Sequence, residues 1–339
     1  MTSAAQQPSR PAPKVWSVSL VRNEIDIVEA FVRHNASLLD GMAIVDHGST
    51  DGTFDVLAEL ARERLPVLLI RSSAPGYLQE RMTTAIARDV FRQVGADFVL
   101  PLDADEFLKM RSRAAFDRAL QAFPSDMNGL LHWLTYVPDF DAPSGDILAL
   151  LRGSKRMAKE RHVFHKALVS RYLMSRPEAT LANGNHFVAR RPRGTSEDAE
   201  PHARIRDEFA AIAHVPIRSA AQFVTKVAVK KMGRIAANYD WKPDAASQAA
   251  YEAVVANRPL DAATLREHAV NWSVPRGNWI APHDATLVDD PFLAPIELRY
   301  TPPRAAEPLP LVLGAAERLV RRLAEARAAR PRAAGGGMR

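Results

Sequence analysis

The chain has 339 residues, 47% hydrophobic and 25% charged, which is typical of a globular protein with one large domain or two fused lobes. It contains no cysteine, which excludes disulfides, a thiolate nucleophile and cysteine-bound metals and fits a reducing compartment. The net charge of +6 does not predict a nucleic-acid groove, because residues 304–339 alone carry eight arginines against three glutamates.

The first four predicted strands alternate with helices. Residues 1–13, small and polar with prolines, predict a disordered tail and not a signal peptide. Apolar and β-branched runs then predict strands, and apolar stripes of helical period predict the helices between them. The strands are expected over 14–21, 42–45, 66–70 and 98–102, and the helices over 27–39, 54–61 and 77–94. This alternation with short turns predicts an α/β fold with a doubly wound, mainly parallel sheet.

An acidic turn, residues 103–106, follows the fourth strand. In an extended segment Asp103 and Asp105 project to the same side, and two such carboxylates need a positive partner. A divalent cation that also binds a phosphate-bearing ligand meets this need. The alternative is a structural turn in which Asp105 caps a helix over 114–123 and Glu106 lies near the start of that helix.

Three polar turns are expected to meet at one edge of the sheet. Residues 22–24, 46–51 and 103–106 each follow a strand, and the carboxyl ends of parallel strands share an edge where ligands bind. Neither a Gly-x-Gly-x-x-Gly sequence after the first strand nor a Gly-x-x-x-x-Gly-Lys-Ser/Thr sequence is present. A dinucleotide fold and a P-loop NTPase therefore have no direct support.

These turns carry a resemblance to a known family. The sequences Val-Arg-Asn-Glu at 21–24, Ile-Val-Asp-His-Gly-Ser-Thr-Asp-Gly-Thr at 44–53 and Leu-Asp-Ala-Asp-Glu-Phe at 102–107 resemble the glycosyltransferase family 2 type of GT-A domain. The closest subgroup is the one with an Asp-x-Asp-Glu-Phe metal motif. The similarity covers about residues 14–110 and extends more weakly to about residue 235. It implies a GT-A, Rossmann-like fold that binds a nucleoside-diphosphate sugar.

The resemblance also implies site residues. The nucleotide-sugar contacts that it implies are Val21, Asn23, Glu24, Asp46, His47, Arg81, Asp103, Arg218 and Lys226. Lys166 of the basic stretch 155–166 is added as a cation that could stabilise the leaving diphosphate. The expected ligands of Mn²⁺ or Mg²⁺ are Asp103 and Asp105, completed by His186 or His214, although a buried histidine is more often only a hydrogen-bonded core residue.

The catalytic base is harder to assign. Family 2 implies inversion with an Asp or Glu base, but the usual Glu-Asp base motif is absent in its standard form. The candidates are Asp139, Asp141 and Glu178, and we favour Asp139 because it follows the strand after the acidic turn. A plain surface turn remains an equal interpretation of Asp139. Glu106 is expected to take part in catalysis beside it.

The second half of the chain is less regular. A strand over 128–137, a basic stretch over 155–166, a surface loop over 190–202 and a helix over 219–239 are expected. Residues 240–303 have no clear period, and their Trp241, Trp272 and Trp279 are either core or a sugar-stacking surface. The expected units are 14–125 for the nucleotide sugar, 126–239 for the acceptor and metal, the extension 240–303, and the basic end 304–339.

The basic end predicts one helix over 309–329. Its apolar face is expected to hold Leu313, Ala316, Leu319, Val320 and Leu323, with an outer face of Arg318, Arg321, Arg322 and Glu325. Such a helix either docks on the body of the protein or lies on an anionic membrane. The Gly-rich sequence after Pro331 predicts disorder.

The resulting hypothesis is a metal-dependent glycosyltransferase with a carbohydrate or glycolipid acceptor. Its expected setting is surface or capsule polysaccharide synthesis in the cytoplasm, with peripheral membrane contact and without nucleic acid. A nucleotidyltransferase that makes nucleotide sugars would need a Gly-rich basic loop after the first strand. A haloacid-dehalogenase-type phosphatase would carry Asp-x-Asp on its first strand. A non-catalytic carbohydrate-binding protein is the remaining alternative, and it would not depend on metal.

Overall fold

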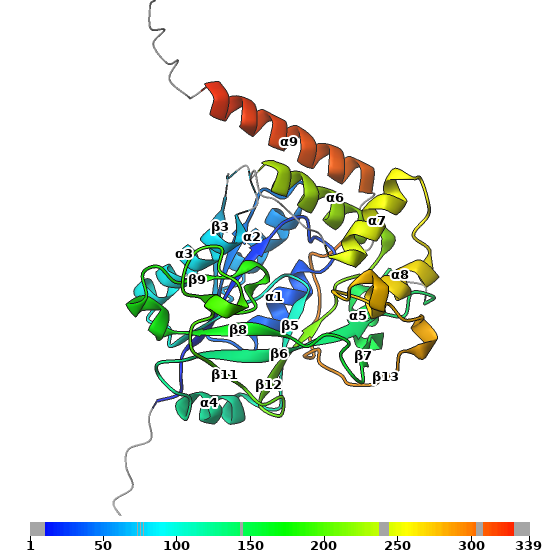
Figure 1. Ribbon diagram of the computed structural model, residues 1–339. Helices are drawn as coiled ribbons and strands as arrows, with labels where there is room; N and C mark the ends of the chain where they lie inside the picture. The colour runs from blue at the N-terminus through cyan, green and yellow to red at the C-terminus, as the bar shows by residue number, and fades with distance from the viewer. Residues whose placement is uncertain are drawn as a thin grey trace, which may run out of the picture.

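A computed structural model of the chain describes residues 11–72, 74, 76, 78–142, 145–236, 244–302 and 308–328 (Figure 1). Tyr77, Trp241 and the predicted tails at 1–10 and 329–339 lie outside the described residues. The fold is an α/β sheet with helices on both faces and a helical C-terminal part, as the sequence predicts.

The first half is a parallel sheet in the order β3-β2-β1-β4. Its strands are β1 (Val15–Val21), β2 (Gly41–Asp46), β3 (Val67–Arg71) and β4 (Phe98–Pro101), and its helices are α1 (Val28–Ala36), α2 (Thr53–Arg62) and α3 (Gln79–Gln93). Successive side chains of β2 point to opposite faces, so Met42 and Ile44 join the core under α1 and α2, whereas Ala43 joins the core under α3. This alternation covers both faces and explains the uniformly buried strand.

The second half of the sheet is mixed. β8 (Phe164–Ser170) pairs antiparallel with β4, and β6 (Asn128–Val137) pairs antiparallel with β8. The remaining strands of this sheet are β5 (Glu106–Met110), β7 (Lys155–Met157), β11 (His202–Arg204), β12 (Ala210–His214) and β13 (Leu287–Val288). A separate hairpin joins β9 (Thr180–Leu181) to β10 (Val188–Ala189). The parallel character is therefore concentrated in the half that carries the three polar turns.

The acidic turn connects two strands and does not start a helix. β5 begins at Glu106 and pairs antiparallel with β12, which places His214 opposite Glu106. The following helix, α4 (Arg113–Gln121), is capped by Ser112, whose Oγ accepts a hydrogen bond from the backbone N of Ala115 at 3.2 Å. The alternative in which Asp105 caps this helix is therefore wrong, because β5 separates the two.

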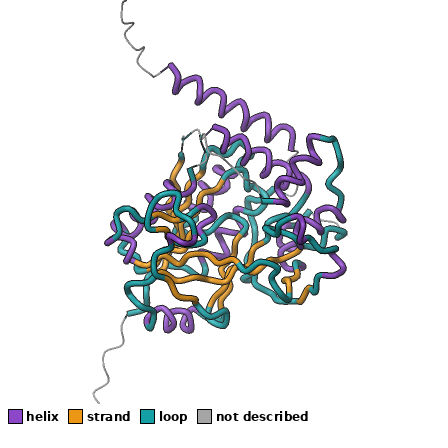
Figure 2. The backbone as a smooth tube through the Cα atoms, viewed as in Figure 1, coloured by secondary structure: helices purple, strands orange, loops and turns teal. Residues whose placement is uncertain are grey.

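Helices form most of the C-terminal part (Figure 2). They are α5 (Ile147–Gly153), α6 (Ala220–Ala236), α7 (Ala245–Val255), α8 (Ala262–Val270) and α9 (Pro308–Ala328), with 3₁₀ turns at Arg171–Ser175, Asn183–Asn185, Ser196–Asp198, Arg276–Asn278 and Pro282–Asp284. Residues 240–303 show no clear period because α7 is rich in alanine, which packs without a strong apolar stripe. Phe223 of α6 and Ala250 of α7 share one apolar cluster with Leu265 of α8.

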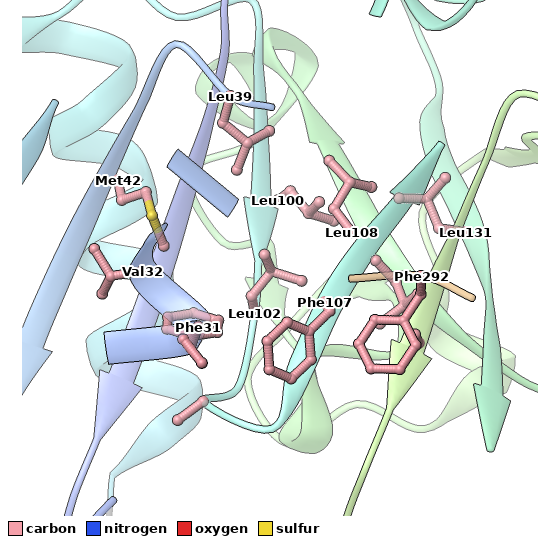
Figure 3. Close-up of a cluster of buried hydrophobic side chains, with 14 of the residues drawn as sticks. Phe31, Val32, Leu39, Met42, Leu100, Leu102, Phe107, Leu108, Leu131 and Phe292 are labelled. Atoms are coloured by element: carbon pink, nitrogen blue, oxygen red, sulfur yellow. The ribbon is translucent and has the colours of Figure 1, made fainter. Parts of the chain in front are cut away.

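A late segment of the chain closes the main core. Phe292 packs on Phe107 of β5 with ring centroids 5.3 Å apart, and Phe107 contacts Phe31 of α1 edge to face at 6.4 Å (Figure 3). Close by, the buried carboxylate of Glu29 accepts hydrogen bonds from the backbone N atoms of residues 299, 300 and 301, each at 2.8 Å. We call this set of bonds the Glu29 clasp. It fixes the end of the body to α1.

The terminal helix meets our expectation only in part: Ala316 and Leu319 are partly buried and Arg321 and Glu325 are exposed, as predicted. α9 lies along α6 (Figure 1), and Ala315 on its inner side is fully buried. The apolar residues Leu309, Leu313, Val320 and Leu323 are exposed. Arg318 and Arg322 are partly buried, so the predicted outward basic face is wrong for these two. No described helix is long and apolar enough to cross a lipid bilayer.

Candidate active site

A cavity of about 280 Å³ lies where the ends of β1 and β4 meet α6. The polar groups that line it come from segments far apart in the sequence. They are Arg22 and Glu24 after β1, Gln79 of α3, Asp103 and Asp105 of the acidic turn, Lys166 of β8, His186, His214 of β12, Lys226, Lys230 and Arg234 of α6, Asp244 and Ser273. Two of the three polar turns therefore reach one cavity.

Asp103 is held by a buried lysine. Lys166 Nζ lies 2.8 Å from Asp103 Oδ2 and 2.9 Å from Glu106 Oε1, and it also donates to the backbone oxygen of Gly184 at 2.9 Å. Gln79 Nε2 donates to Asp103 Oδ1 at 3.2 Å. Burial lowers the pKa of Lys166, but Asp103 and Glu106 outweigh it and raise that pKa above its ordinary value. The lysine therefore stays charged and neutralises the turn.

Glu106 supports the acidic turn from below. Its side chain is fully buried and is not among the cavity-lining groups, and its Oε2 accepts a hydrogen bond from the backbone N of Asp103 at 2.9 Å. Burial raises the pKa of Glu106 to about 8, against the effect of Lys166. Glu106 can thus stabilise the conformation of the turn. It does not reach the cavity, so it does not contact a ligand there.

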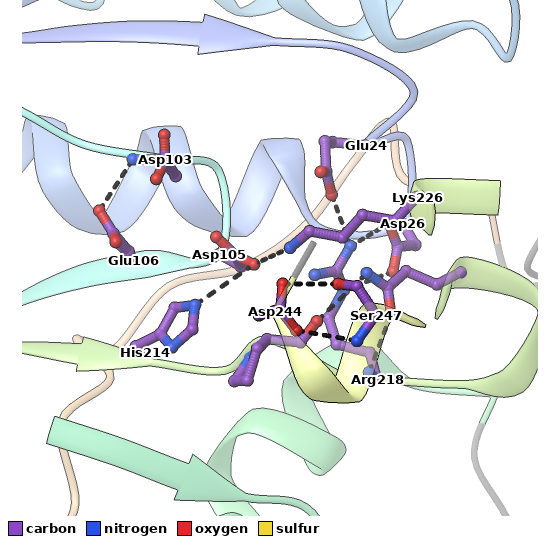
Figure 4. Close-up of polar contacts among 12 residues, drawn as sticks. Glu24, Asp26, Asp103, Asp105, Glu106, His214, Arg218, Lys226, Asp244 and Ser247 are labelled. Carbon is purple, nitrogen blue, oxygen red and sulfur yellow. Dashed lines mark hydrogen bonds and ion pairs between the residues drawn. The ribbon is translucent and has the colours of Figure 1, made fainter. Parts of the chain in front are cut away.

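Asp105 is paired with a cation from α6. Its Oδ2 contacts the ammonium of Lys226 and lies 3.6 Å from His214 Nε2 (Figure 4). Burial acts to raise the pKa of Asp105, but Lys226 and then His214 outweigh it and lower that pKa well below its ordinary value. Asp105 is therefore a buried carboxylate that stays ionised.

One face of α6 forms the cationic wall of the cavity. Lys226, Lys230 and Arg234 are spaced four residues apart, which places them on one side of a helix, and all three line the cavity. Burial lowers the pKa of Lys230, which makes no ion pair with a described acid. The acidic turn and this cationic stripe face the same space.

Glu24 belongs to a second buried ion network. Arg218 donates to Glu24 Oε2 at 2.6 Å and to both carboxylate oxygens of Asp26, at 2.6 and 2.9 Å (Figure 4). Burial raises the pKa of Glu24 to about 7, although Arg218 opposes this. Arg218 itself lines a neighbouring cavity, together with Asp26 and Asp146. Arg218 therefore orients Glu24 from behind.

Two histidines and two tryptophans complete the wall. His186 Nδ1 lies 2.8 Å from the backbone oxygen of His165, and because that oxygen only accepts, Nδ1 carries the proton. Burial lowers the pKa of His186 to about 4, so its ring is neutral and Nε2 has a free lone pair. The ring of His214 stacks on Trp133 with centroids 4.0 Å apart and lies 5.9 Å from the ring of Trp272, and both tryptophans line the cavity.

Glycine at position 184 makes room for His186. The backbone φ of Gly184 is +78°, and a Cβ atom there would lie 2.6 Å from His186 Nε2. No other residue type fits both constraints without displacing the ring.

The turn after β2 packs against the turn after β1 without lining the cavity. The backbone N of Asn23 donates to Ser49 Oγ at 3.0 Å, and the backbone N of Thr50 donates to Asn23 Oδ1 at 2.8 Å. Asp46 is buried and accepts from the backbone N atoms of 48 and 49, and His47 Nε2 lies 3.1 Å from the oxygen of Ala74. Val21 is a buried core residue whose oxygen accepts from the backbone N of 47.

Two predicted residues lie elsewhere. Arg81 is an exposed residue of α3 and does not line the cavity. Asp139 is exposed after β6, where its carboxylate lies 3.8 Å from Arg266. The assignment of Asp139 as catalytic base stays a prediction that this arrangement does not favour.

The cavity contains the types of side chain that bind a divalent cation, carboxylates and neutral imidazoles. Asp103, Asp105 and the neutral histidines line one cavity, and the buried Nδ1 of His214 has no hydrogen-bond partner. In the arrangement described, lysines contact both aspartates, and the described residues contain no group of three His, Asp or Glu side chains close enough to hold an ion. Metal binding at this site would therefore exchange lysine contacts for metal contacts.

Several cavity residues were missed in the sequence. Lys230 and Arg234 could have been found from their spacing of four residues after Lys226 on a predicted helix. Arg22 lies within the first motif, Val-Arg-Asn-Glu, but the resemblance implies no role for it. Gln79, Trp133 and Asp244 carry no sequence signal that separates them from core or cap residues.

Among known proteins, the chain is similar to solved structures. No family model matches the sequence, and no curated protein matches it. Among solved structures, the chain is similar to a mannosyltransferase from Pyrobaculum calidifontis in complex with GDP-Man and Mn²⁺, at 15% identity and a TM-score of 0.36, over 92% of this chain and 88% of that one. It is also similar to glucosyl-3-phosphoglycerate synthase from Mycobacterium tuberculosis in complex with Mn²⁺, UDP and glucosyl-3-phosphoglycerate, at 15% identity and a TM-score of 0.32, over 66% and 78%. A likeness of this extent establishes no family.

Proposed function

We propose that this protein is a GT-A type glycosyltransferase that transfers a sugar from a nucleoside-diphosphate sugar to an acceptor hydroxyl. The observation that carries the proposal is the cavity in which the acidic turn, Asp103 and Asp105, faces the cationic stripe of α6. A diphosphate needs cations, and a sugar needs carboxylates and aromatic surfaces. The cavity offers all three together.

Each wall has a role in this proposal. Lys226, Lys230 and Arg234 neutralise the diphosphate and the charge that it gains as it leaves. Trp133 and Trp272 provide flat surfaces for a sugar ring. The turns after β1 and β2 lie beside the cavity and hold the nucleoside, with Asn23 and Glu24 toward the ribose or base.

A divalent cation, Mn²⁺ or Mg²⁺, is part of the proposal. Asp103, Asp105 and either His186 or His214 would hold it, because these are the oxygen and neutral imidazole donors of the cavity. When bound, it would supply positive charge to the diphosphate. Lys166 and Lys226 already place cations at these acids, so the alternative is transfer that relies on the lysines alone.

The reaction joins the acceptor oxygen to the anomeric carbon. The bond from that carbon to the diphosphate oxygen breaks, the nucleoside diphosphate takes the electron pair, and a base takes the hydroxyl proton. A single displacement of this kind inverts the anomeric centre. Asp139 remains the proposed base from the sequence, and an acceptor that approaches it would have to enter from the side of β6.

The acceptor is proposed to be a carbohydrate or glycolipid of a surface polysaccharide, used at the cytoplasmic side of a membrane. The supporting feature is the exposed apolar edge of α9, formed by Leu309, Leu313, Val320 and Leu323. Apolar residues on the outer side of a helix that also carries arginines are typical of peripheral membrane binding. Flotation with anionic vesicles, in which a Leu313→Glu, Val320→Glu variant stays unbound, tests this part separately.

Ligand-induced thermal shift tests the main proposal. UDP and GDP, each with Mn²⁺, with Mg²⁺ or with EDTA, are added to the protein, and the Tm is recorded. A ligand at one hundred times its Kd adds about 2.7 kcal/mol of stability, which for a chain of this length is ~4 °C. We expect this shift with metal for at least one nucleotide. An equal rise in Tm in the presence of EDTA would favour the alternative in which the lysines bind the diphosphate without a metal ion.

Two variants locate the effect. Asp105→Asn removes a cavity carboxylate, and Asp289→Asn removes an exposed one whose side chain is 83% accessible. We compare the ligand-induced shift and not the starting Tm, because Asp105→Asn also unpairs Lys226. The shift should vanish in Asp105→Asn and persist in Asp289→Asn. An unchanged shift in Asp105→Asn would refute the site.

Product analysis separates the enzyme from the alternatives. Slow release of nucleoside diphosphate from UDP- or GDP-sugars is expected of a glycosyltransferase. Release of pyrophosphate from a nucleoside triphosphate would instead identify a nucleotidyltransferase. Binding without any release, with every metal tried, would identify a non-catalytic binding protein.

A further inference from the structure

The inward arginines of α9 form an arrangement that helix packing alone does not explain. α9 buries Ala315 and partly buries Arg318 and Arg322, whereas Leu313 and Val320 stay exposed at 56% and 64%. The partly buried Leu311, Val312 and Leu319 lie on the same side of the helix, and the partial burial of the two guanidinium groups is what packing alone does not favour. The contacts of the arginines therefore explain better why these residues of α9 face the body of the protein.

Arg322 reaches the turn after β2. Its Nη1 donates to the backbone oxygen of Ala74 at 3.2 Å. The guanidinium nitrogens lie 3.1 and 3.2 Å from the position that a Cβ atom would take on Gly48, whose φ is +73°. Gly314, one helical turn before Arg318, lies against Thr50 of the same loop. α9 thus covers the turn that the proposed function assigns to the nucleoside.

Arg22 adds a third cation from the body of the protein. It follows β1, lines the cavity beside the acidic turn, and has a buried Nε with no hydrogen-bond partner. Neither Arg22 nor Arg318 makes an ion pair with a described acid. The neighbouring Asp46 is already engaged by the backbone N atoms of 48 and 49.

These arginines act on one another. Burial lowers the pKa of Arg22, and Arg322 and Arg318 lower it further, whereas Asp46 opposes them. Burial and Arg318 likewise lower the pKa of Arg322. Like charges held together in this way repel, and an anion placed among them would relieve the repulsion.

We propose that Arg22, Arg318 and Arg322 form a phosphate-binding site that α9 completes at the rim of the cavity. This inference rests on the proposed function and extends it by giving the terminal helix a role in ligand binding. Guanidinium groups present paired N–H donors that match two phosphate oxygens. Binding of the phosphate and docking of α9 then stabilise each other by the same factor.

Two ligands could supply the phosphate: the diphosphate of the sugar donor, or a phosphate on the acceptor. Titration calorimetry with the full chain distinguishes them, with UDP, GDP, uridine, guanosine, pyrophosphate and glycerol 3-phosphate as probes. If the donor supplies the group, a nucleoside diphosphate binds and is sensitive to Arg322, whereas the nucleoside is not. If the acceptor supplies it, only glycerol 3-phosphate responds to Arg322.

Adjacent arginines of α9 that differ in exposure provide a matched pair of variants. Arg322→Ala removes an inward guanidinium, and Arg321→Ala removes an exposed one from the same helix. We expect Arg322→Ala to weaken phosphate-ligand binding about tenfold or more, the usual effect of losing a charged hydrogen bond. Arg321→Ala should bind as the wild type does. Equal binding by Arg322→Ala and wild type would overturn the inference.

The outcomes separate this inference from the proposed function. If nucleotides bind equally well to both variants, the phosphate site is wrong and the proposed function stands. If pyrophosphate binds in an Arg322-dependent way but no nucleotide binds, the phosphate site stands and the proposed function is wrong. If no probe binds, both are wrong. Should Arg322→Ala fail to fold, Arg318→Ala, which breaks no ion pair with a described acid, repeats the test.

The absence of cysteine allows a direct measurement of helix docking. A single cysteine introduced as Val320→Cys lies on the exposed side of α9 and is the unique site for a thiol-reactive dye. The rotational freedom of the dye, measured by fluorescence anisotropy, should fall when the phosphate ligand is added. It should not change when Arg322→Ala is present in the same chain. A ligand-bound protein with unchanged anisotropy would contradict the coupling.

Discussion

Replacing Lys166 by methionine should strongly destabilise the protein. Lys166 is fully buried, and its ammonium lies within 2.9 Å of Asp103, Glu106 and the Gly184 oxygen. Lys166→Met keeps the length of the side chain but leaves two carboxylates without their cation. Breaking a buried ion pair from one side costs about 3–5 kcal/mol. With an unfolding entropy of about 2.1 cal/mol/K per residue, the Tm should fall by roughly 4–7 °C.

Calorimetry at several pH values tests the reasoning behind this number. Burial already raises the pKa of Glu106 to about 8, and loss of Lys166 should raise it further. A carboxyl group whose pKa is raised by folding binds a proton more tightly in the folded state, so stability falls as the pH rises above the unfolded value. Lys166→Met should therefore lose more stability at pH 9 than at pH 6.

A second substitution serves as the control. Glu106→Gln, added to Lys166→Met, removes one of the two unpaired carboxylates, so the double variant should be more stable than Lys166→Met alone. It should also lose the pH dependence between pH 6 and 9. Two results would refute the account of the buried network. The first is a double variant in which the two destabilising effects simply add. The second is a Tm of Lys166→Met within about 1 °C of wild type, a difference that corresponds to roughly 1 kcal/mol.

Two further predictions concern stability. Burial lowers the pKa of His34 to about 4 from 6.5, so the unfolded chain binds a proton that the folded one does not between these values, and stability should fall as the pH drops from 6.5 to 4. His34→Gln should flatten that part of the curve of unfolding free energy against pH. Gly41→Ala should lower the free energy of unfolding in urea by about 1–3 kcal/mol, because the new Cβ would lie 2.4 Å from the Trp16 ring. Gly153→Ala is the control: no atom lies within 4 Å of its Cβ position, so the free energy of unfolding should hardly change.

The sequence predicts the parallel half of the fold well because each element there has a strong local signal. β2 and β4 contain continuous apolar runs, β1 alternates apolar residues with Ser17 and Ser19, and α1 and α2 have regular apolar stripes. β5 escapes notice because its five residues follow an acidic turn and include a lysine. α7 and α8 were missed because alanine packs closely without creating a stripe, so their burial depends on partners that the sequence does not reveal.

The candidate site divides in the same way. Residues carried by a motif, Asp103, Asp105 and Glu24, do line the cavity, because the turns that hold them follow neighbouring parallel strands. The pairing of each acid with a particular lysine could not be predicted, since it depends on where the fold places Lys166 of β8 and Lys226 of α6. The orientation of α9 was mispredicted in part, because Leu313, Val320 and Leu323 were expected to face the core but are exposed, whereas Arg318 and Arg322 are partly buried.

The Glu29 clasp makes the order of synthesis matter for this protein. The backbone N atoms that donate hydrogen bonds to the Glu29 carboxylate lie 270 to 272 residues later in the chain, so they are synthesised much later. At about 5–20 residues per second, a ribosome takes on the order of half a minute to supply them. Until then the edge of Phe107 that Phe292 covers stays open to water. A nascent chain that stops short of this segment is therefore left with an unsealed aromatic core, and the cell's chaperones and proteases meet it in that state.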